Sequence, residues 1–362
     1  MKQSTFFRLV IITLLLVGLT LFSLKTEEAA LSTGNNEGNM LIPNLATSAV
    51  RLDRIAVGRQ NKILHIKKNN DETWVLKEKN NHPVSIAIMN KTLDSLAQSE
   101  MIAQKTADPE RLKQLGLTDK LAVHLKLYEE DADSPAIDLL IGRFAPDLNG
   151  TYVKYVGEDK SWLASGNLVP PIESSHWLEQ RLFALPPTHI RNITIETFEP
   201  EGKVVTLERP TLSSLFSING TPSDTHDRPQ QYALTALLKG LSDVVFYDVL
   251  PHRVITKNPR VRRYTIDTFD GLRITMSMHH KVHLWTEITA EFKPDLSLYE
   301  KPTGKVAEIK NARDRENKLR SLRLLPPELT KKRVKAMNTK SEDWAYQMPS
   351  GILQMITKDL VE

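Results

Sequence analysis

The stretch Glu72–Asn81, with the sequence ETWVLKEKNN, decides how the fold is interpreted because it sets a large aromatic residue among polar neighbours. Trp74 and Leu76 alternate with Val75 and Lys77, and this period of two is typical of a strand with one buried face. A ring displayed for a ligand is the alternative. The alternation predicts that Trp74 is mostly buried beneath the helix that follows.

A second stretch, LFSIN at Leu215–Asn219, falls at the matching place in the other half of the chain and sets Phe216 opposite Trp74. The offset between matching segments stays between about 131 and 145 residues over six strands and one long helix. Self-similarity in this order predicts two copies of a β-β-β-α-β-β-β module. An aromatic side chain at both places is therefore expected to serve packing.

The expected fold class is α+β, with two related modules of mostly antiparallel sheet and a helix on one face of each. Helices are expected over residues 85–98 and 230–242, where apolar residues recur at helical spacing. A short helix begins after Asp108 and ends at Gly116. The expected strands of the two halves match in this order: Ile55–Val57 with Ile193–Ile195, Lys62–Ile66 with Lys203–Leu207, Thr73–Lys77 with Leu215–Asn219, Leu121–Tyr128 with Arg263–Phe269, Ala136–Ile141 with Leu272–Met278, and Thr151–Val156 with Val282–Thr289.

Composition excludes several classes of protein. The chain has 362 residues, of which 40% are hydrophobic and 25% charged, so it is long enough for two cores. A net charge of +4 is too small to imply nucleic acid as a partner. The chain contains no cysteine, which excludes a disulfide framework, a zinc ribbon, a cysteine nucleophile and a lipoprotein anchor.

The N-terminus carries an apolar run at residues 6–24, FFRLVIITLLLVGLTLFSL, interrupted only by Arg8. Positive charge precedes the run, which predicts a cytoplasmic N-terminus and a body on the far side of the inner (cytoplasmic) membrane. Glu27 and Glu28 spoil the small-residue pattern that a signal peptidase needs. We therefore expect an uncleaved, single-pass signal anchor, with a cleaved signal peptide as the alternative.

These patterns divide the chain into seven parts. The linker is rich in Asn, Gly, Ser and Thr, and the connector lies between two proline pairs. The parts are residues 1–5 as cytoplasmic N-terminus, 6–24 as transmembrane anchor, 25–50 as flexible linker, 51–168 as first α+β module, 169–187 as helical connector, 188–292 as second α+β module, and 293–362 as C-terminal basic helical segment.

The C-terminal segment is basic, with 11 Lys and Arg against 4 Asp and Glu between Glu308 and Lys340. Helices are expected over about 308–320 and 327–337. This surface is either an ordinary solvated one or a site for anionic headgroups or polymers. A last helix from about 351 would carry one apolar face, either packed on the body or open to a partner; its apolar residues are Ile352, Leu353, Ile356 and Leu360.

Candidate chemistry is sparse. The sequence MHHKVH at Met278–His283 contains three histidines, but zinc needs three or four converging ligands, and a polar hairpin turn explains the pattern better. Metal binding by His279, His280 and His283 is retained as the alternative. Neither a G-x-S-x-G motif nor a phosphate-binding glycine loop occurs.

Two further motifs are interpreted as turns. Ser165-Gly166 closes an expected strand, and the acidic run Glu129–Asp133 lacks the spacing of a calcium loop. We assign no catalytic, cofactor-binding or metal residues and expect no cofactor.

Several short motifs occur in an order that is typical of a known family. They are Ile55 and Val57, Trp74 and Leu76, Gly116-Leu117, Ile141-Gly142, Tyr152-Val153 and Trp344-Ala-Tyr346. With these motifs the chain resembles a bacterial family of membrane-anchored domains of unknown function, over most of residues 50–362. Some members of that family are encoded beside, or fused to, the gliding-motility type of ABC-transporter auxiliary protein, and the resemblance supplies no catalytic residues.

The expected function is that of a non-enzymatic accessory protein that binds envelope or inner-membrane proteins from the periplasmic or extracytoplasmic side. The resemblance implies ABC-transporter subunits as candidate partners. A module that binds envelope polysaccharide or peptidoglycan is the alternative, with Trp162 and Trp285 stacking on sugars. A periplasmic metal-dependent hydrolase is less favoured.

Overall fold

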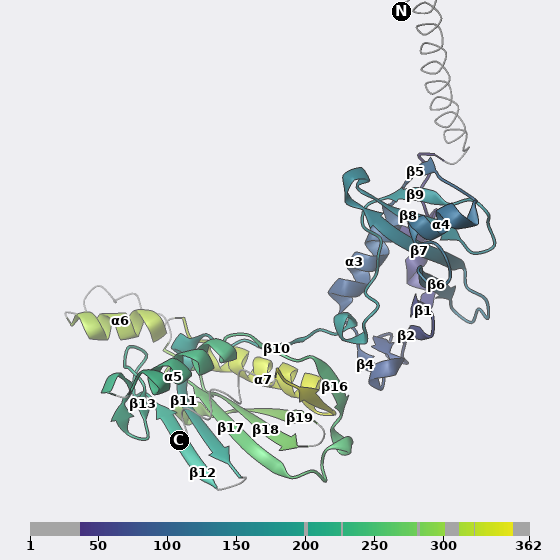
Figure 1. Cartoon of the computed structure of the whole chain (residues 1–362). Helices are drawn as coiled ribbons and strands as arrows, with labels where there is room; N and C mark the ends of the chain where they lie inside the picture. The colour runs from purple at the N-terminus through teal and green to yellow at the C-terminus, as the bar shows by residue number, and fades with distance from the viewer. Residues whose placement is uncertain are drawn as a thin grey trace, which may run out of the picture. The chain divides into compact units, whose positions relative to one another are not determined.

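The chain forms two compact units, one ending at Leu178 and the other beginning at Glu179 (Figure 1). The computed structural model describes residues 37–198, 202–225, 227–280, 283–300, 311–321 and 323–349. Each unit contains a nine-stranded sheet in which the neighbouring strands run antiparallel, and helices accompany both sheets. The expected α+β class is confirmed.

The predicted membrane anchor lies outside the described residues. Both the cytoplasmic residues 1–5 and the span 6–24 fall in the part that the structure does not describe. Within the described ranges, no helix has the length and apolar character that crossing a membrane requires.

Unit 1 is built on a sheet whose alternating side chains bury one face. Val57, Ile66 and Leu125 are almost fully buried on that face. The helices are α2 (Leu45–Ser48), α3 (Ile86–Ala97) and α4 (Pro109–Leu115). The strand order is β4 (His82–Pro83), β3 (Trp74–Leu76), β2 (Lys62–Lys68), β1 (Leu52–Arg59), β6 (Val123–Glu129), β7 (Ile137–Ala145), β8 (Gly150–Tyr155), β9 (Trp162–Ser165) and β5 (Met101–Gln104).

Unit 2 repeats this arrangement. Its helices are α5 (Arg228–Leu241), α6 (Ala312–Ser321) and α7 (Pro327–Ser341), and a small sheet pairs β10 (Arg181–Phe183) with β15 (Val244–Val245). The strand order of the large sheet is β14 (Thr221–Pro222), β13 (Ser217–Ile218), β12 (Lys203–Glu208), β11 (Ile190–Thr197), β17 (Arg260–Thr268), β18 (Leu272–His280), β19 (Leu284–Phe292), β20 (Trp344–Gln347) and β16 (Asp248–Pro251).

The two large sheets share strand order, register and irregularities. Ile55 pairs with Ile66 as Ile193 pairs with Leu207. The first strand of each unit carries a register shift at the same place, between Leu52 and Arg54 in β1 and between Ile190 and Asn192 in β11. Because bulges are positioned features of a sheet, this coincidence supports one module used twice.

The registers place Trp74 and Phe216 at equivalent positions. Trp74 lies opposite Lys68, and Phe216 immediately precedes β13, whose Ser217 lies opposite Glu208. Phe216 is 6% exposed, as predicted, whereas Trp74 is only half-buried. Each ring has a cation near its face, Lys68 beside Trp74 and Arg209 beside Phe216.

The linker prediction for residues 25–50 needs correction from residue 37 onward. Leu41, Ile42 and Leu45 are buried, and the Tyr155 hydroxyl donates a hydrogen bond to the Leu41 carbonyl. Backbone hydrogen bonds join residues 38–41 to the edge of the sheet at Ser99 and Met101. Small polar neighbours conceal these apolar residues in the sequence, although unit 1 needs them to complete its core.

The prediction of a helical connector over residues 169–187 is also corrected. The segment forms a 3-10 turn at Ser174–Trp177 and then strand β10. Trp177 is fully buried in unit 1, and its ring N–H donates to the Pro171 carbonyl at 2.9 Å. The boundary between the units falls after Leu178, so one helix cannot cover the segment.

The C-terminal segment 293–362 is not a separate element. Strand β20 lies between β19 and β16 in the large sheet of unit 2, which corrects the expected end of the second module at residue 292. Helices α6 and α7 are therefore an insertion between two neighbouring strands. The final helix expected from about 351 lies outside the described residues.

Sheet edges are protected by different devices. Pro83 and Pro222 occupy equivalent places in the edge strands β4 and β14, where a proline offers no N–H to a further strand. In unit 2, the Asn338 carboxamide on α7 bonds both the N–H and the carbonyl of Ala290, at 2.8 and 2.9 Å. Helix α7 thus covers the part of β19 that β20 does not pair.

Candidate interaction surfaces

The histidines of Met278–His283 do not converge. The segment belongs to the hairpin of β18 and β19, as predicted, but His279 and His280 lie in strand β18 and not in the turn. His279 is 5% exposed, whereas His280 and His283 are exposed to solvent. Among the described residues, no group of three or more His, Asp or Glu side chains has the arrangement to hold a metal ion.

His279 instead belongs to a chain of polar contacts that the sequence did not suggest. Its Nδ1 lies 3.0 Å from the Asn258 carbonyl, and its Nε2 lies 3.4 Å from a carboxylate oxygen of Glu287. The other oxygen of Glu287 lies 2.7 Å from Nε2 of His252. These contacts tie the 3-10 turn at His252–Val254 to the hairpin. No spacing in the sequence could reveal them, because they join three separate elements.

The other candidate motifs are turns, as predicted. The Ser165 hydroxyl accepts a hydrogen bond from the Glu100 N–H at 2.9 Å, and Gly166 has a φ of 82°. The acidic run Glu129–Asp133 connects β6 to β7, and Glu129 forms an ion pair with Arg51 at 2.8 Å.

The two tryptophans considered for sugar stacking are inside the protein. Trp162 is 3% exposed and Trp285 is 7% exposed. Neither ring can therefore offer a face to a polysaccharide from outside. Because both side chains point to a buried face of their sheet, these two residues are not available to stack on sugars as expected.

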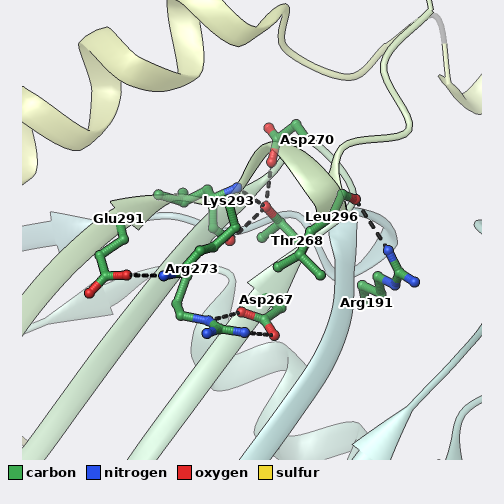
Figure 2. Close-up of polar contacts among 9 residues, drawn as sticks. Arg191, Asp267, Thr268, Asp270, Arg273, Glu291, Lys293 and Leu296 are labelled. Atoms are coloured by element: carbon green, nitrogen blue, oxygen red, sulfur yellow. Dashed lines mark hydrogen bonds and ion pairs between the residues drawn. The ribbon is translucent and has the colours of Figure 1, made fainter.

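A polar network closes the turn between β17 and β18 (Figure 2). The Arg273 guanidinium donates to both carboxylate oxygens of Asp267, at 2.6 and 2.8 Å, and this hydrogen bonding raises the pKa of Arg273. The Thr268 hydroxyl donates to the buried Asp270 and accepts from the Leu272 N–H at 3.0 Å. These contacts hold the turn in place and present no open site.

A hollow of about 640 Å³ lies on the less buried face of the unit 1 sheet. His65 on β2, together with His124 and Lys126 on β6, reaches this face because alternate residues of a strand point to opposite sides. The hollow is lined by Ala56, Gln60, Asn61, Ile63, His65, Asp119, His124, Lys126 and Tyr128.

Neighbouring contacts fix the side chains around this hollow. Nδ1 of His65 lies 2.7 Å from Glu78, and the ammonium of Lys126 lies 3.2 Å from Asp138. The Arg54 guanidinium lies 4.8 Å from the centre of the Tyr128 ring. The surface therefore offers both signs of charge and one aromatic ring, held by short contacts.

A second hollow, of about 330 Å³, lies at the C-terminal end of α5 in unit 2. Its lining is largely apolar, and Lys239 and Asp243 are the charged residues at its rim. The lining residues are Ala236, Lys239, Gly240, Leu241, Asp243, Val244, Val245, Met276, Met348 and Pro349. We call this hollow the α5 groove.

Fold and surfaces together define a two-unit α+β protein that presents hollows and, among the described residues, no group of side chains arranged to hold a metal ion. The chain belongs to the family described as Domain of unknown function (DUF4340), whose model matches residues 74–267. The match begins in β3 of unit 1 and ends in β17 of unit 2, so it spans both units. No curated protein and no solved structure matches the chain.

Proposed function

We propose that this protein is a non-enzymatic accessory protein that binds another envelope protein through the hollow on the unit 1 sheet. The observation that supports this proposal is the hollow of about 640 Å³, in which ion pairs and ring contacts already hold the side chains in place. A surface fixed before binding loses little side-chain entropy in a complex. Its mixed charges and single aromatic ring suit a protein partner with complementary polar groups.

The proposed location is the extracytoplasmic side of the inner membrane, with residues 6–24 as a single-pass anchor. The apolar run and the positive charges before it support this location. Unit 1 begins soon after that run, since residues 38–41 already pair with the sheet. The anchor would therefore keep the unit 1 hollow close to other proteins of the membrane.

The proposed partners are inner-membrane proteins, with subunits of an ABC transporter as the first candidates. This choice rests on the resemblance of Trp74, Leu76 and the other short motifs to a family associated with such transporters. Nucleic acid is not proposed, because a net charge of +4 gives no strong basic field.

The test is affinity capture of the full chain from detergent-solubilised membranes, with a matched pair of variants. Ile63→Glu places a carboxylate in the hollow. Val204→Glu makes the same change at the equivalent place of unit 2, because Ile63 pairs with Gly58 as Val204 pairs with Glu196. We expect a membrane partner to be captured by the native chain and by V204E, and to be lost with I63E.

Two results would contradict the proposal. Recovery of no membrane protein by the native chain is one, and equal recovery by both variants is the other. Retention of the native chain on purified envelope polysaccharide or peptidoglycan, lost in I63E, would favour the sugar-binding alternative. Tyr128 would then be the aromatic residue available for stacking in the hollow.

A further inference from the structure

The α5 groove lies where the described part of the chain ends. Met348 and Pro349, its last described residues, line the groove themselves. Thirteen more residues, 350–362, follow in the sequence. Because the residues that precede this segment line the groove, the segment can reach the groove without a long linker.

In unit 1, the segment after the equivalent strand lies along the helix of that unit. After β9, the chain returns along α3, and Leu168 becomes buried. Asn167–Pro171 share one hollow with Lys91 and Ser95 of α3. Further on, the Ser85 N–H at the start of α3 donates to the Trp177 carbonyl at 2.7 Å. The segment after the last strand of unit 1 is therefore the partner of its helix.

The strand registers align the two places. Trp162 on β9 pairs with Val153 of β8, and Tyr346 on β20 pairs with Thr286 of β19, the strand equivalent to β8. Trp162 and Tyr346 are therefore equivalent, and counting six residues onward makes Ile352 the equivalent of Leu168.

The helices align in the same way. Leu96 near the end of α3 and Leu241 at the end of α5 are both buried, and we align the helices on them. Ser95 is then equivalent to Gly240, and Lys91 to Ala236. Unit 2 thus has small residues where unit 1 has larger ones. Small side chains leave an apolar hollow and allow a segment to approach the helix closely.

We propose that the C-terminal segment from Ile352 to Leu360 of the same chain occupies the α5 groove. Two independent observations carry this assignment: the groove is walled by the residues that lead into the segment, and the equivalent segment of unit 1 lies against its helix. The sequence supplies matching chemistry, because Ile352, Leu353 and Ile356 form one apolar face if the segment is helical. Lys358 and Asp359 offer both signs of charge, as do Lys239 and Asp243 at the rim.

The first test uses the absence of cysteine from the chain, so an introduced pair is the only pair present. The full chain, purified in detergent, carries Ala236→Cys with Ile352→Cys. The control carries Gln231→Cys, exposed on the same helix but outside the groove, with Ile352→Cys. We expect the groove pair to cross-link with a short bis-maleimide about tenfold faster than the control pair, because docking raises the effective concentration.

A second measurement keeps the proposal testable if the cysteine variants fold poorly. Leu353→Asp puts a charge on the apolar face, and Gln354→Asp puts the same charge beside it. We expect L353D to lower the melting temperature of unit 2 by on the order of 5 °C, and Q354D to leave it nearly unchanged. Equal cross-linking of both cysteine pairs, or equal melting of the two aspartate variants, would overturn the assignment. Neither result bears on capture of a partner by unit 1.

Discussion

The Arg209 guanidinium packs against two aromatic rings in unit 2, with Cζ 4.8 Å from the centre of Phe216 and 5.4 Å from that of Phe269. Its Nε and Nη2 donate to the carbonyls of Ile190 and Pro187, each at 2.8 Å. Burial, aided by the nearby charge of Arg320, lowers the pKa of Arg209 to about 10. The side chain stays charged at neutral pH, and its guanidinium provides a donor for the carbonyl of the buried Ile190.

Lys68 is the equivalent cation of unit 1, and the two positions can be compared directly. Its ammonium lies 5.6 Å from the Trp74 ring centre and 3.3 Å from the exposed carboxylate of Glu72. We expect Arg209→Ala to lower the free energy of unfolding of unit 2 by about 2 to 4 kcal/mol, because it removes a charged donor from the carbonyl of the buried Ile190 and the packing of the guanidinium against two rings. Lys68→Ala is expected to cost less than about 1 kcal/mol. Urea unfolding of both variants measures the difference, and equal losses would refute it.

Tyr155 gives unit 1 a dependence on alkaline pH. Burial, with a smaller contribution from Glu158, raises the pKa of Tyr155 to about 12 from 10.0. Because the folded state keeps the proton more tightly, the stability from this group is full below pH 10 and falls as the pH rises through about 12. Tyr155→Phe also loses the hydrogen bond to the Leu41 carbonyl.

The expected result is a variant that is less stable than the native chain at pH 8, with a smaller further loss between about pH 10 and 12. Urea midpoints of unit 1 unfolding, measured at several pH values, provide the comparison. Other groups that titrate in this range affect both proteins and cancel in the difference. Parallel pH curves for the two proteins would show that Tyr155 does not contribute as described.

At the scale of the elements, α7 replaces a strand at the edge of β19. The two hydrogen bonds from Asn338 to Ala290 imitate the pairing of a neighbouring strand, and the Ser341 hydroxyl adds a third contact, to the Ile288 carbonyl at 2.9 Å. Asn338→Leu removes the carboxamide and exposes an unpaired strand edge. We expect a loss of about 1 to 3 kcal/mol and concentration-dependent association of the folded protein. Urea unfolding and light scattering test this, with Thr339→Leu, exposed on the same helix, as the control.

Most large elements could be predicted from the sequence because their signals are local. The strand at Trp74–Leu76 and the cap Asp108, which accepts a hydrogen bond from the Glu110 N–H at 3.0 Å, depend only on nearby residues. The single buried face predicted for that strand is not seen, because Val75 and Leu76 are both buried. The place of β20 could not be predicted, since its pairing with β19 spans the inserted helices. The prediction of a helical connector was wrong for a similar reason. Trp177 is buried in unit 1 by residues distant in the sequence, and the spacing of apolar residues around it does not reveal this.

The candidate surfaces were less predictable than the strands. The outward face of β6 follows from alternation, but the hollow also needs Gln60, Asn61 and Asp119 from turns outside the strands. The contact of Glu287 with two histidines likewise depends on three elements that meet only in the fold. A sequence pattern can assign a residue to one face of a strand or helix. A site depends on the distances between residues of different elements, which the pattern does not give.

At the scale of the whole molecule, one module serves in two versions. In unit 1, β8 and β9 are joined directly, whereas unit 2 carries α6 and α7 between the equivalent strands. Helix α7 covers the β19 edge in unit 2, while the corresponding strand of unit 1 is paired by β9. The equivalent strand edges are thus covered by a strand in unit 1 and by a helix in unit 2. The surfaces of the two units differ as a result.

The boundaries of unit 1 lead to a prediction about which fragment folds alone. Residues 37–178 contain every described element of unit 1, whereas residues 51–168, the limits suggested by the sequence, lack five large buried apolar side chains: Leu41, Ile42, Leu45, Trp177 and Leu178. Each such side chain contributes about 1.5 to 3 kcal/mol when buried, so their loss removes roughly 10 kcal/mol. A domain of this size is stable by only about 5 to 15 kcal/mol. We therefore expect the fragment 37–178 to unfold in one cooperative urea transition and the fragment 51–168 to show none. A cooperative transition of similar midpoint in the shorter fragment would mean that the segments 37–50 and 169–178 lie on unit 1 without supporting it.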